Sequence, residues 1–146
     1  MGKLIKTKNQ KYKIAFICTG NSCRSQMAEG FAKYFAAKSG AGDILEIYSA
    51  GTNPKKAINP DAIKVMSEAG IDISNQHTKL INDIPSFMDT VITMGCIDGC
   101  PAIPHNYFED WDLEDPDGKP IEKFREVRDK IEKKTKDLIV KIKDML

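Results

Sequence analysis

The 146-residue sequence lacks long hydrophobic runs and any excess of charge of one sign. No stretch approaches the roughly 18 apolar residues that cross a bilayer, and the first apolar run, Ile14 to Ile17, is too short for a secretory signal. The 22 Lys and Arg nearly balance the 21 Asp and Glu, so no global field attracts nucleic acid or an anionic membrane. We therefore expect a cytoplasmic protein with no nucleic-acid or membrane partner, in which a local site holds any bound anion.

Histidine is also scarce. His77 and His105 are the only two, and neither stands in the spacing of a catalytic triad or a metal site, so we interpret both as surface or turn residues. Hydrophobic residues make up 41% of the chain, enough for one core, and no repeat or linker divides it. We expect a monomer with a single domain over residues 1–146, in which residues 1–12 form a flexible start.

Strand and helix patterns alternate along the chain. Short apolar or β-branched runs predict strands over 13–17, 45–50 and 90–94, with a further short strand around Tyr107. Helices are predicted from Ser25 to Gly40, from Pro60 to Gly70, over a shorter stretch from Thr78 to Ile84, and from Ile121 onwards. This alternation is typical of an α/β fold, so we expect a three-layer domain with a central parallel sheet of about four strands flanked by helices. Ligands of such sheets bind at the carboxyl ends of the strands.

The four cysteines form two close pairs, each just past a predicted strand: Cys18 with Cys23, and Cys96 with Cys100. Stable disulfides are rare in the cytosol, which leaves catalysis, redox chemistry or metal binding. Zinc binding by all four is a non-enzymatic alternative, because their spacings just fit paired ligands. Arg24 beside the first pair would oppose a cation, so we expect no metal.

The first pair lies in a loop where Cys18 and Arg24 stand in a Cys-x5-Arg spacing. Gly20 permits the backbone angles that turn successive N–H groups inwards, and the following helix adds the partial positive charge of its N-terminus. Arg24 can clamp an oxyanion bidentately, and the same donors favour the thiolate of Cys18, the predicted nucleophile. The alternative without a functional site is an ordinary strand-to-helix turn with a buried, inert Cys18 and a surface Arg24. The predicted oxyanion-binding residues are Thr19, Gly20, Asn21, Ser22, Cys23, Arg24 and Ser25.

The loop sequence Cys-Thr-Gly-Asn-Ser-Cys-Arg-Ser-Gln-Met-Ala-Glu-Gly resembles the low-molecular-weight protein tyrosine phosphatase superfamily, and within it the thiol-dependent arsenate reductases. The resemblance covers nearly the whole chain and implies a phosphatase-type phosphate loop after the first strand. It continues through Tyr48 to Gly51, Asn59-Pro60, Gly70 to Ser74, Cys100-Pro101 and Asp115-Pro116.

The resemblance implies two chemistries on one scaffold. In the phosphatases the loop cysteine, here Cys18, attacks phosphorus, and the aspartate of an Asp-Pro pair, here Asp115, acts as the acid. In the reductases the loop cysteine forms an adduct with arsenate, a second thiol, here Cys96, attacks it and releases arsenite, and a third, here Cys100, takes over the disulfide. The resemblance then implies no bound cofactor and an external reductant, thioredoxin or a low-molecular-weight thiol, with phosphate as a competitor.

Two departures from the family pattern bear on this choice. The Cys96-x3-Cys100 interval is shorter than in the best-known thioredoxin-coupled members, so an adduct resolved by a low-molecular-weight thiol is an alternative to the relay. Asp117-Gly118 stands where phosphatases carry the aromatic residues of the phosphotyrosine slot, which favours a small inorganic substrate. We therefore predict an arsenate reductase, with aryl phosphate hydrolysis as the alternative.

Other loop residues have smaller predicted roles. Cys23 is interpreted as a structural residue or a protective partner for Cys18. Asn21, Glu29 and Ser49 match positions that help bind potassium in some related reductases, and Lys79 stands at the position of the fourth ligand, an acid. An ammonium there can replace the cation, so we predict no potassium dependence.

Overall fold

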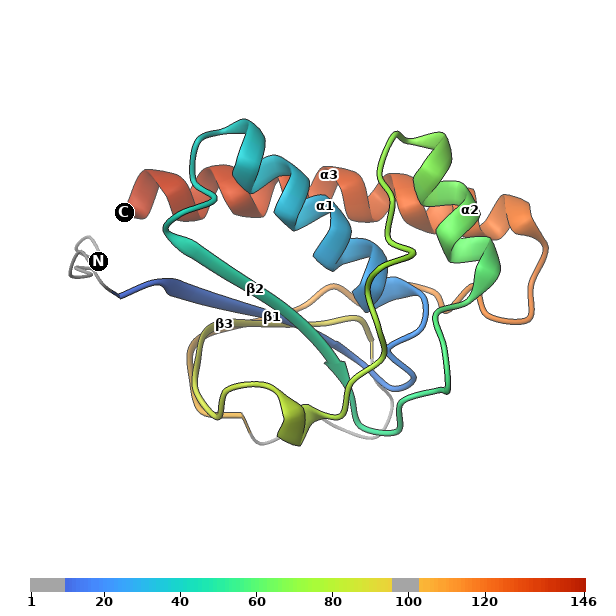
Figure 1. The fold of residues 1–146 in the computed structure, drawn as a ribbon, viewed down its shortest axis with the longest axis horizontal. Coiled ribbons are helices and arrows are strands. Elements are labelled where there is room, and N and C mark those ends of the chain that lie inside the picture. Colours follow the sequence, from blue (N-terminus) through green and yellow to red (C-terminus); the bar gives the residue numbers. More distant parts are fainter. Residues whose placement is uncertain (1–9, 96–102) are drawn as a thin grey trace.

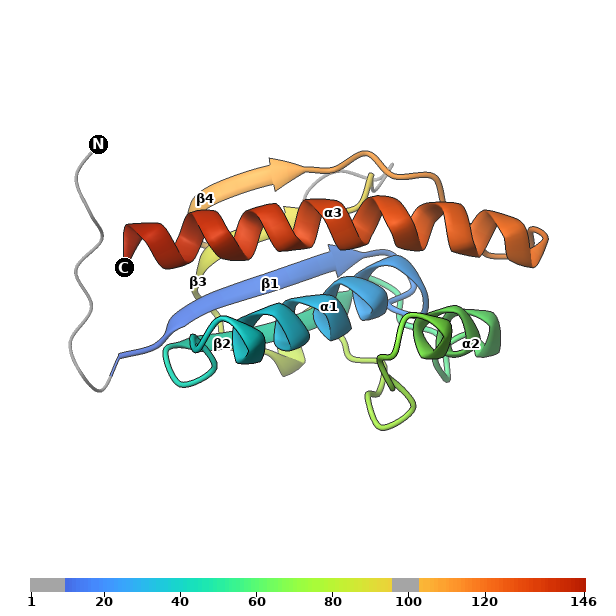
Figure 2. The same cartoon turned by 90° about the horizontal axis from the view of Figure 1, so that it is seen from above.

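The computed structural model describes residues 10–95 and 103–146. Four strands form one sheet in the order β2-β1-β3-β4, and every neighbouring pair is parallel (Figures 1 and 2). The strands are β1 (Tyr12–Cys18), β2 (Leu45–Gly51), β3 (Met88–Thr93) and β4 (His105–Asp110). The helices are α1 (Arg24–Lys38), α2 (Pro60–Glu68), the short 3-10 helix η1 (Ile81–Asp83) and α3 (Ile121–Met145). The predicted α/β class and parallel four-stranded sheet are confirmed.

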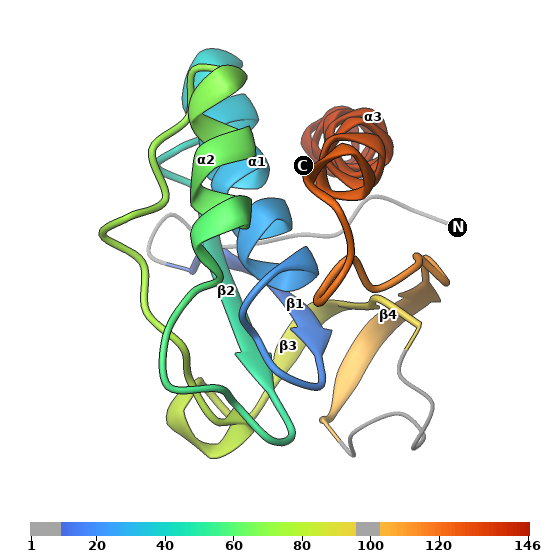
Figure 3. The ribbon, with the colours of Figure 1, turned by 90° about the vertical axis from the view of Figure 1, so that its right-hand side faces the viewer.

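The three α-helices lie together on one face of the sheet (Figures 2 and 3). Their core with that face includes Phe16 of β1, Phe31 of α1 and Phe124 of α3, all buried. The opposite face has its own smaller core, which includes Ile17, Met88 and Ile84. Among the described residues, η1 and its adjoining turns form the layer on that side. Both faces of the central strand β1 are thus buried, which explains its uninterrupted apolar run.

The ends of two predicted elements shift in the structure. Tyr12, which we placed in the flexible start, is buried in β1, where its hydroxyl lies 2.6 Å from the Thr90 hydroxyl. The helix predicted from Thr78 to Ile84 is wrong, since only η1 forms there. The Asp83 carboxylate caps the N-terminus of η1 by accepting the Leu80 N–H at 3.0 Å, and Pro85 prevents η1 from extending further.

Strand β4 is longer than the short strand predicted around Tyr107. It pairs only with β3, so it is the edge of the sheet, and most of its side chains are at least partly exposed. An edge strand needs no strict apolar alternation, and its pattern in the sequence is correspondingly weak. Trp111, just beyond it, packs on Phe16 with ring centroids 5.7 Å apart.

Candidate functional site

A pocket of about 230 Å³ lies at the carboxyl ends of the strands, where the predicted phosphate loop follows β1. The connections that reach this end of the molecule include the loop from β1 to α1, the connection from β2 to α2, and the one from β4 to α3 (Figure 1). The pocket is lined by Cys18, Thr19, Gly20, Asn21, Ser22, Cys23, Arg24, Asn53, Pro54, Lys55, Asp115 and Asp117.

Cys18 ends β1 and is only 3% exposed. Its Sγ lies 2.8 Å from the Ser25 hydroxyl and accepts the backbone N–H of Asn21 at 3.2 Å. The Ser25 oxygen also accepts a hydrogen bond from the Asn21 side-chain amide at 2.8 Å, which leaves the Ser25 proton free to point at the sulfur. Ser25 and the Asn21 N–H thus both contact the sulfur of the predicted nucleophile. Ser25 is fully buried and is not among the residues that line the pocket, and its predicted role as an oxyanion ligand stays a prediction.

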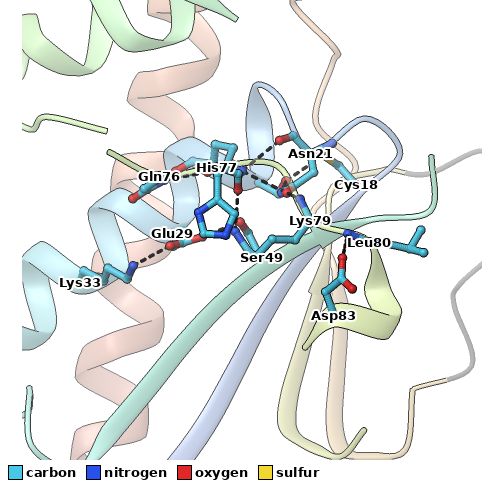
Figure 4. Close-up of polar contacts among 12 residues, drawn as sticks. Cys18, Asn21, Glu29, Lys33, Ser49, Gln76, His77, Lys79, Leu80 and Asp83 are labelled. Atoms are coloured by element: carbon cyan, nitrogen blue, oxygen red, sulfur yellow. Dashed lines mark hydrogen bonds and ion pairs between the residues drawn. The ribbon is translucent and has the colours of Figure 1, made fainter. Parts of the chain in front are cut away.

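Asn21 fixes the shape of the loop. Its φ of 49° lies in the left-handed region, and its side-chain oxygen accepts the Lys79 N–H at 2.8 Å and the Gln26 amide at 3.0 Å. Asn21 thus contacts both Cys18, through its backbone N–H, and Lys79, through its side-chain oxygen (Figure 4). Gln26 also reaches the Asn21 and His77 carbonyls, so α1 and the 76–79 segment together hold the loop closed.

The end of β2 packs directly under the same loop. A Cβ on Gly51 would lie 2.5 Å from the Thr19 carbonyl oxygen and 3.1 Å from the backbone nitrogen of Asn21. Only glycine permits this approach. The Asn53 N–H donates to the Thr19 carbonyl at 2.9 Å, so the connection after β2 supports the loop over several residues.

Arg24 is buried at the start of α1 and ties two other segments to the loop. Its Nη1 donates to the Met94 carbonyl at 2.5 Å and to the Leu113 carbonyl at 2.8 Å. Its Nη2 lies 3.7 Å from Asp115, whose side chain is largely exposed. The structure therefore places Cys18, Arg24 and Asp115 around one pocket, while their catalytic roles stay predictions.

Cys23 differs from Cys18 in its surroundings. Burial raises the pKa of Cys23 to about 12, and the hydrogen bond with Ser22 offsets this only in part. Asp115 and Asp117 raise this pKa further. Cys23 therefore stays a neutral thiol at physiological pH, and its role as a structural residue or as a protective partner for Cys18 stays a prediction.

A buried carboxylate lies behind the loop. Glu29 of α1 is 4% exposed and accepts the Ser49 hydroxyl at 2.5 Å and the Lys33 ammonium at 2.6 Å (Figure 4). The Lys79 ammonium lies 3.6 Å from the same carboxylate and donates to the His77 carbonyl at 2.7 Å. Lys79 thus stands beside Glu29 and Ser49, two of the three residues that the sequence analysis matched to potassium-binding positions, whereas Asn21 contacts the main chain of Lys79.

Some predicted residues lie outside the described part of the chain, and some pocket residues were not predicted. Cys96 and Cys100 fall in the first group, so their predicted roles stay predictions. Met94, two residues before Cys96, donates its N–H to the Ile17 carbonyl at 3.1 Å, next to Cys18. Lys55 was missed, because nothing in its local sequence marks it. Lys33 could have been noticed from its i,i+4 spacing to Glu29.

Comparisons with known proteins agree with this geometry. Residues 13–145 match the family model described as low molecular weight phosphotyrosine protein phosphatase. The chain is 50% identical over 127 residues to "Arsenate reductase 1" of Staphylococcus epidermidis, covering 84% of this chain and 91% of that protein. It resembles the solved structure described as "An arsenate reductase in the phosphate binding state" with a TM-score of 0.78 and 41% identity, over 90% of this chain and 98% of the other. A thioredoxin-dependent arsenate reductase from Corynebacterium glutamicum matches at 30% identity and a TM-score of 0.76, over 96% and 66%.

Proposed function

Because this chain belongs to the low molecular weight phosphotyrosine protein phosphatase family, in its arsenate reductase branch, we propose that it reduces arsenate to arsenite through a cysteine relay. The observation that carries the proposal is the surroundings of Cys18. Its sulfur meets two hydrogen-bond donors at the base of a pocket that Arg24 also lines. A thiolate nucleophile and an oxyanion substrate can both be stabilised by the hydrogen-bond donors of this pocket.

The first step forms the arsenic adduct. The loop N–H groups and Arg24 hold arsenate, and the Cys18 thiolate attacks arsenic. An As–S bond forms while an As–O bond breaks, and Asp115 supplies a proton so that the oxygen leaves as water. Asp115 is placed for this role because it lines the same pocket as Cys18.

The second step transfers two electrons to arsenic. The Cys96 thiolate attacks the Cys18 sulfur, an S–S bond forms, the As–S bond breaks, and its electron pair leaves with arsenic as arsenite. Cys100 then attacks Cys96, which frees the Cys18 thiolate. The hydrogen bond from Met94 to Ile17 supports this order, since it anchors the chain next to Cys18 only two residues before Cys96.

An external dithiol, thioredoxin, would then reduce the Cys96–Cys100 disulfide. The short interval between these two cysteines keeps the alternative in which a low-molecular-weight thiol resolves the arsenic adduct directly. We further propose a cytoplasmic monomer whose single domain spans the chain, with no resident cofactor and no potassium requirement. Within the described residues, no helix is both long and apolar enough to cross a membrane.

A second candidate function is hydrolysis of aryl phosphates. The same pocket can hold phosphate, Asp115 can protonate an aryl leaving group, and the matching family model carries the phosphatase name. This reaction needs only the Cys18 thiol, so it predicts that Cys96 and Cys100 have no part in turnover.

One assay separates these functions. Arsenate-dependent NADPH consumption is followed with thioredoxin and its reductase for wild type, Cys18→Ser, Cys96→Ser, Cys100→Ser and Cys23→Ser. We expect the first three variants to lose turnover more than about a hundredfold and Cys23→Ser to retain most of it. Full turnover in both Cys96→Ser and Cys100→Ser would overturn the relay. Hydrolysis of p-nitrophenyl phosphate without any arsenate reduction would establish the phosphatase instead.

A further inference from the structure

An ion pair at the rim of the Cys18 pocket joins two connections that are distant in sequence. Lys55, between β2 and α2, donates its ammonium to Asp117, which lies between β4 and α3. The Asn59 side-chain amide donates to the other Asp117 oxygen at 3.0 Å. Both carboxylate oxygens of Asp117 are therefore held by residues of the β2–α2 connection.

This pair lies toward solvent, above the predicted nucleophile. Cys18 is 3% exposed, whereas the side chains of Lys55 and Asp117 are 51% and 33% exposed. All three line the same pocket, so the cysteine lies at its base and the pair at its outer end.

The stem of Lys55 crosses the phosphate loop. A Cβ on Gly20 would lie 3.3 Å from Lys55 Cγ and 3.4 Å from its Cε, so the lysine packs on the backbone of the loop. The Lys55 N–H donates to the Gly20 carbonyl at 2.9 Å, and its carbonyl accepts the Thr78 hydroxyl at 2.7 Å. Hydrogen bonds from both the N–H and the carbonyl of Lys55 thus fix the backbone from which its side chain extends.

Both partners are charged at neutral pH. The hydrogen bond to Asp117 raises the pKa of Lys55, and the same bond lowers the pKa of Asp117. An unpaired carboxylate at this rim would repel an incoming oxyanion, and Lys55 cancels that charge. The pair therefore narrows the entrance without adding net charge to it.

We propose that Lys55 and Asp117 form a clasp that restricts the pocket to small oxyanions and disfavours esters that carry an aryl group. The inference rests on the proposed function, because it takes the oxyanion to sit at Cys18. An aryl substituent on such an anion must extend outward past the rim, where it meets the clasp, whereas arsenate or phosphate fits below it. The clasp is a specificity device and takes no part in bond making.

Two phosphonates that share a headgroup test the clasp. Dissociation constants of methylphosphonate and phenylphosphonate are measured by titration calorimetry with the reduced full chain. Both ligands carry the same phosphonate group and a C–P bond that is not hydrolysed. The ratio of their dissociation constants therefore reports the effect of exchanging the methyl group for the phenyl group. We expect Lys55→Ala and Asp117→Ala each to shift this ratio about fivefold in favour of phenylphosphonate, as fits the loss of one exposed ion pair.

The chain offers a matched control on the same connection. Lys119 forms an exposed ion pair with Glu114 and does not line the pocket, so Lys119→Ala should leave the ratio unchanged. An unchanged ratio in both clasp variants, with methylphosphonate still bound, would overturn the clasp and leave the proposed function standing. Failure of wild type to bind methylphosphonate at all would overturn the oxyanion site and the clasp with it.

Discussion

The Ser25 hydroxyl lies 2.8 Å from Cys18 Sγ, and because the Asn21 amide donates to the Ser25 oxygen, the Ser25 proton is free to point at that sulfur. The relationship joins the last residue of β1 to the first turn of α1. A hydrogen bond to a charged acceptor is stronger than one to a neutral acceptor, so this contact stabilises the thiolate more than the thiol. The Asn21 side-chain oxygen in turn accepts hydrogen bonds from Gln26 and Lys79, so Ser25 belongs to a network of hydrogen bonds.

Ser25→Ala should therefore slow the reaction of Cys18 with iodoacetamide at pH 6 by about tenfold, since one hydrogen bond to the thiolate is lost. The rate is measured by mass spectrometry of the peptide that carries Cys18. Ser22→Ala serves as the control, because the Ser22 hydroxyl lies 3.7 Å from the Cys23 sulfur instead. Equal rates in wild type and Ser25→Ala would show that the hydroxyl does not stabilise the thiolate.

Cys23 gives a prediction for alkaline pH. Burial raises the folded-state pKa of Cys23 from an ordinary 9.0 to about 12, so only the unfolded chain releases this proton between those values. The stability that Cys23 contributes is complete below pH 9 and is lost as the pH rises toward 12. Between pH 9 and 10.5, urea unfolding of wild type should lose on the order of 1 kcal/mol per pH unit more than that of Cys23→Ser. Parallel pH profiles for the two proteins would contradict the shift.

The phosphate loop was predictable because its chemistry is local. Cys18, Gly20 and Arg24 lie within seven consecutive residues between an apolar run and a helical pattern, so sequence spacing alone places them together. The parallel sheet followed from the alternation of strands and helices, although the edge strand β4 was underestimated and β1 begins at Tyr12, one residue earlier than predicted. The family resemblance added Asp115, whose approach to Arg24 no local pattern reveals.

Long-range pairs could not be predicted in the same way. Lys55 and Asp117 are 62 positions apart, and their meeting depends on how two irregular connections pack at one end of the sheet. Glu29 meets Ser49 and Lys79 from other segments, and only the family resemblance indicated that these three residues belong together. Residue type and spacing carry no signal for such contacts, because tertiary packing decides them.

Gly51 tests the close packing of β2 under the loop. Gly51→Ala would place a methyl group 2.5 Å from the Thr19 carbonyl, which must move and take the loop with it. We expect a loss of about 1–3 kcal/mol in the free energy of unfolding, together with weaker phosphate binding. Gly42→Ala is the matched control, since its new Cβ meets only the Ala37 Cα at 3.8 Å, an ordinary contact. A stable Gly51→Ala protein with unchanged phosphate affinity would refute the close approach.

Lys79 tests the predicted independence of potassium. Its ammonium lies 3.6 Å from buried Glu29, near the Ser49 hydroxyl and the His77 carbonyl, where it supplies the positive charge that a bound cation would bring. Wild type should therefore have the same thermal midpoint in potassium chloride as in choline chloride of equal ionic strength. Lys79→Met should lose about 1–2 kcal/mol of stability in choline chloride, because Glu29 then keeps only Lys33 as its cation.

Potassium should restore part of that loss in Lys79→Met, since removal of the ammonium leaves oxygen ligands around a vacated cationic position. Lys33→Met is the control: its ammonium is half exposed and does not contact Ser49 or His77 in the described structure, so its loss should create no response to potassium. A potassium-dependent midpoint in wild type would show that Lys79 does not replace the cation. A Lys79→Met protein as stable as wild type in choline chloride would show that Glu29 does not need the Lys79 charge.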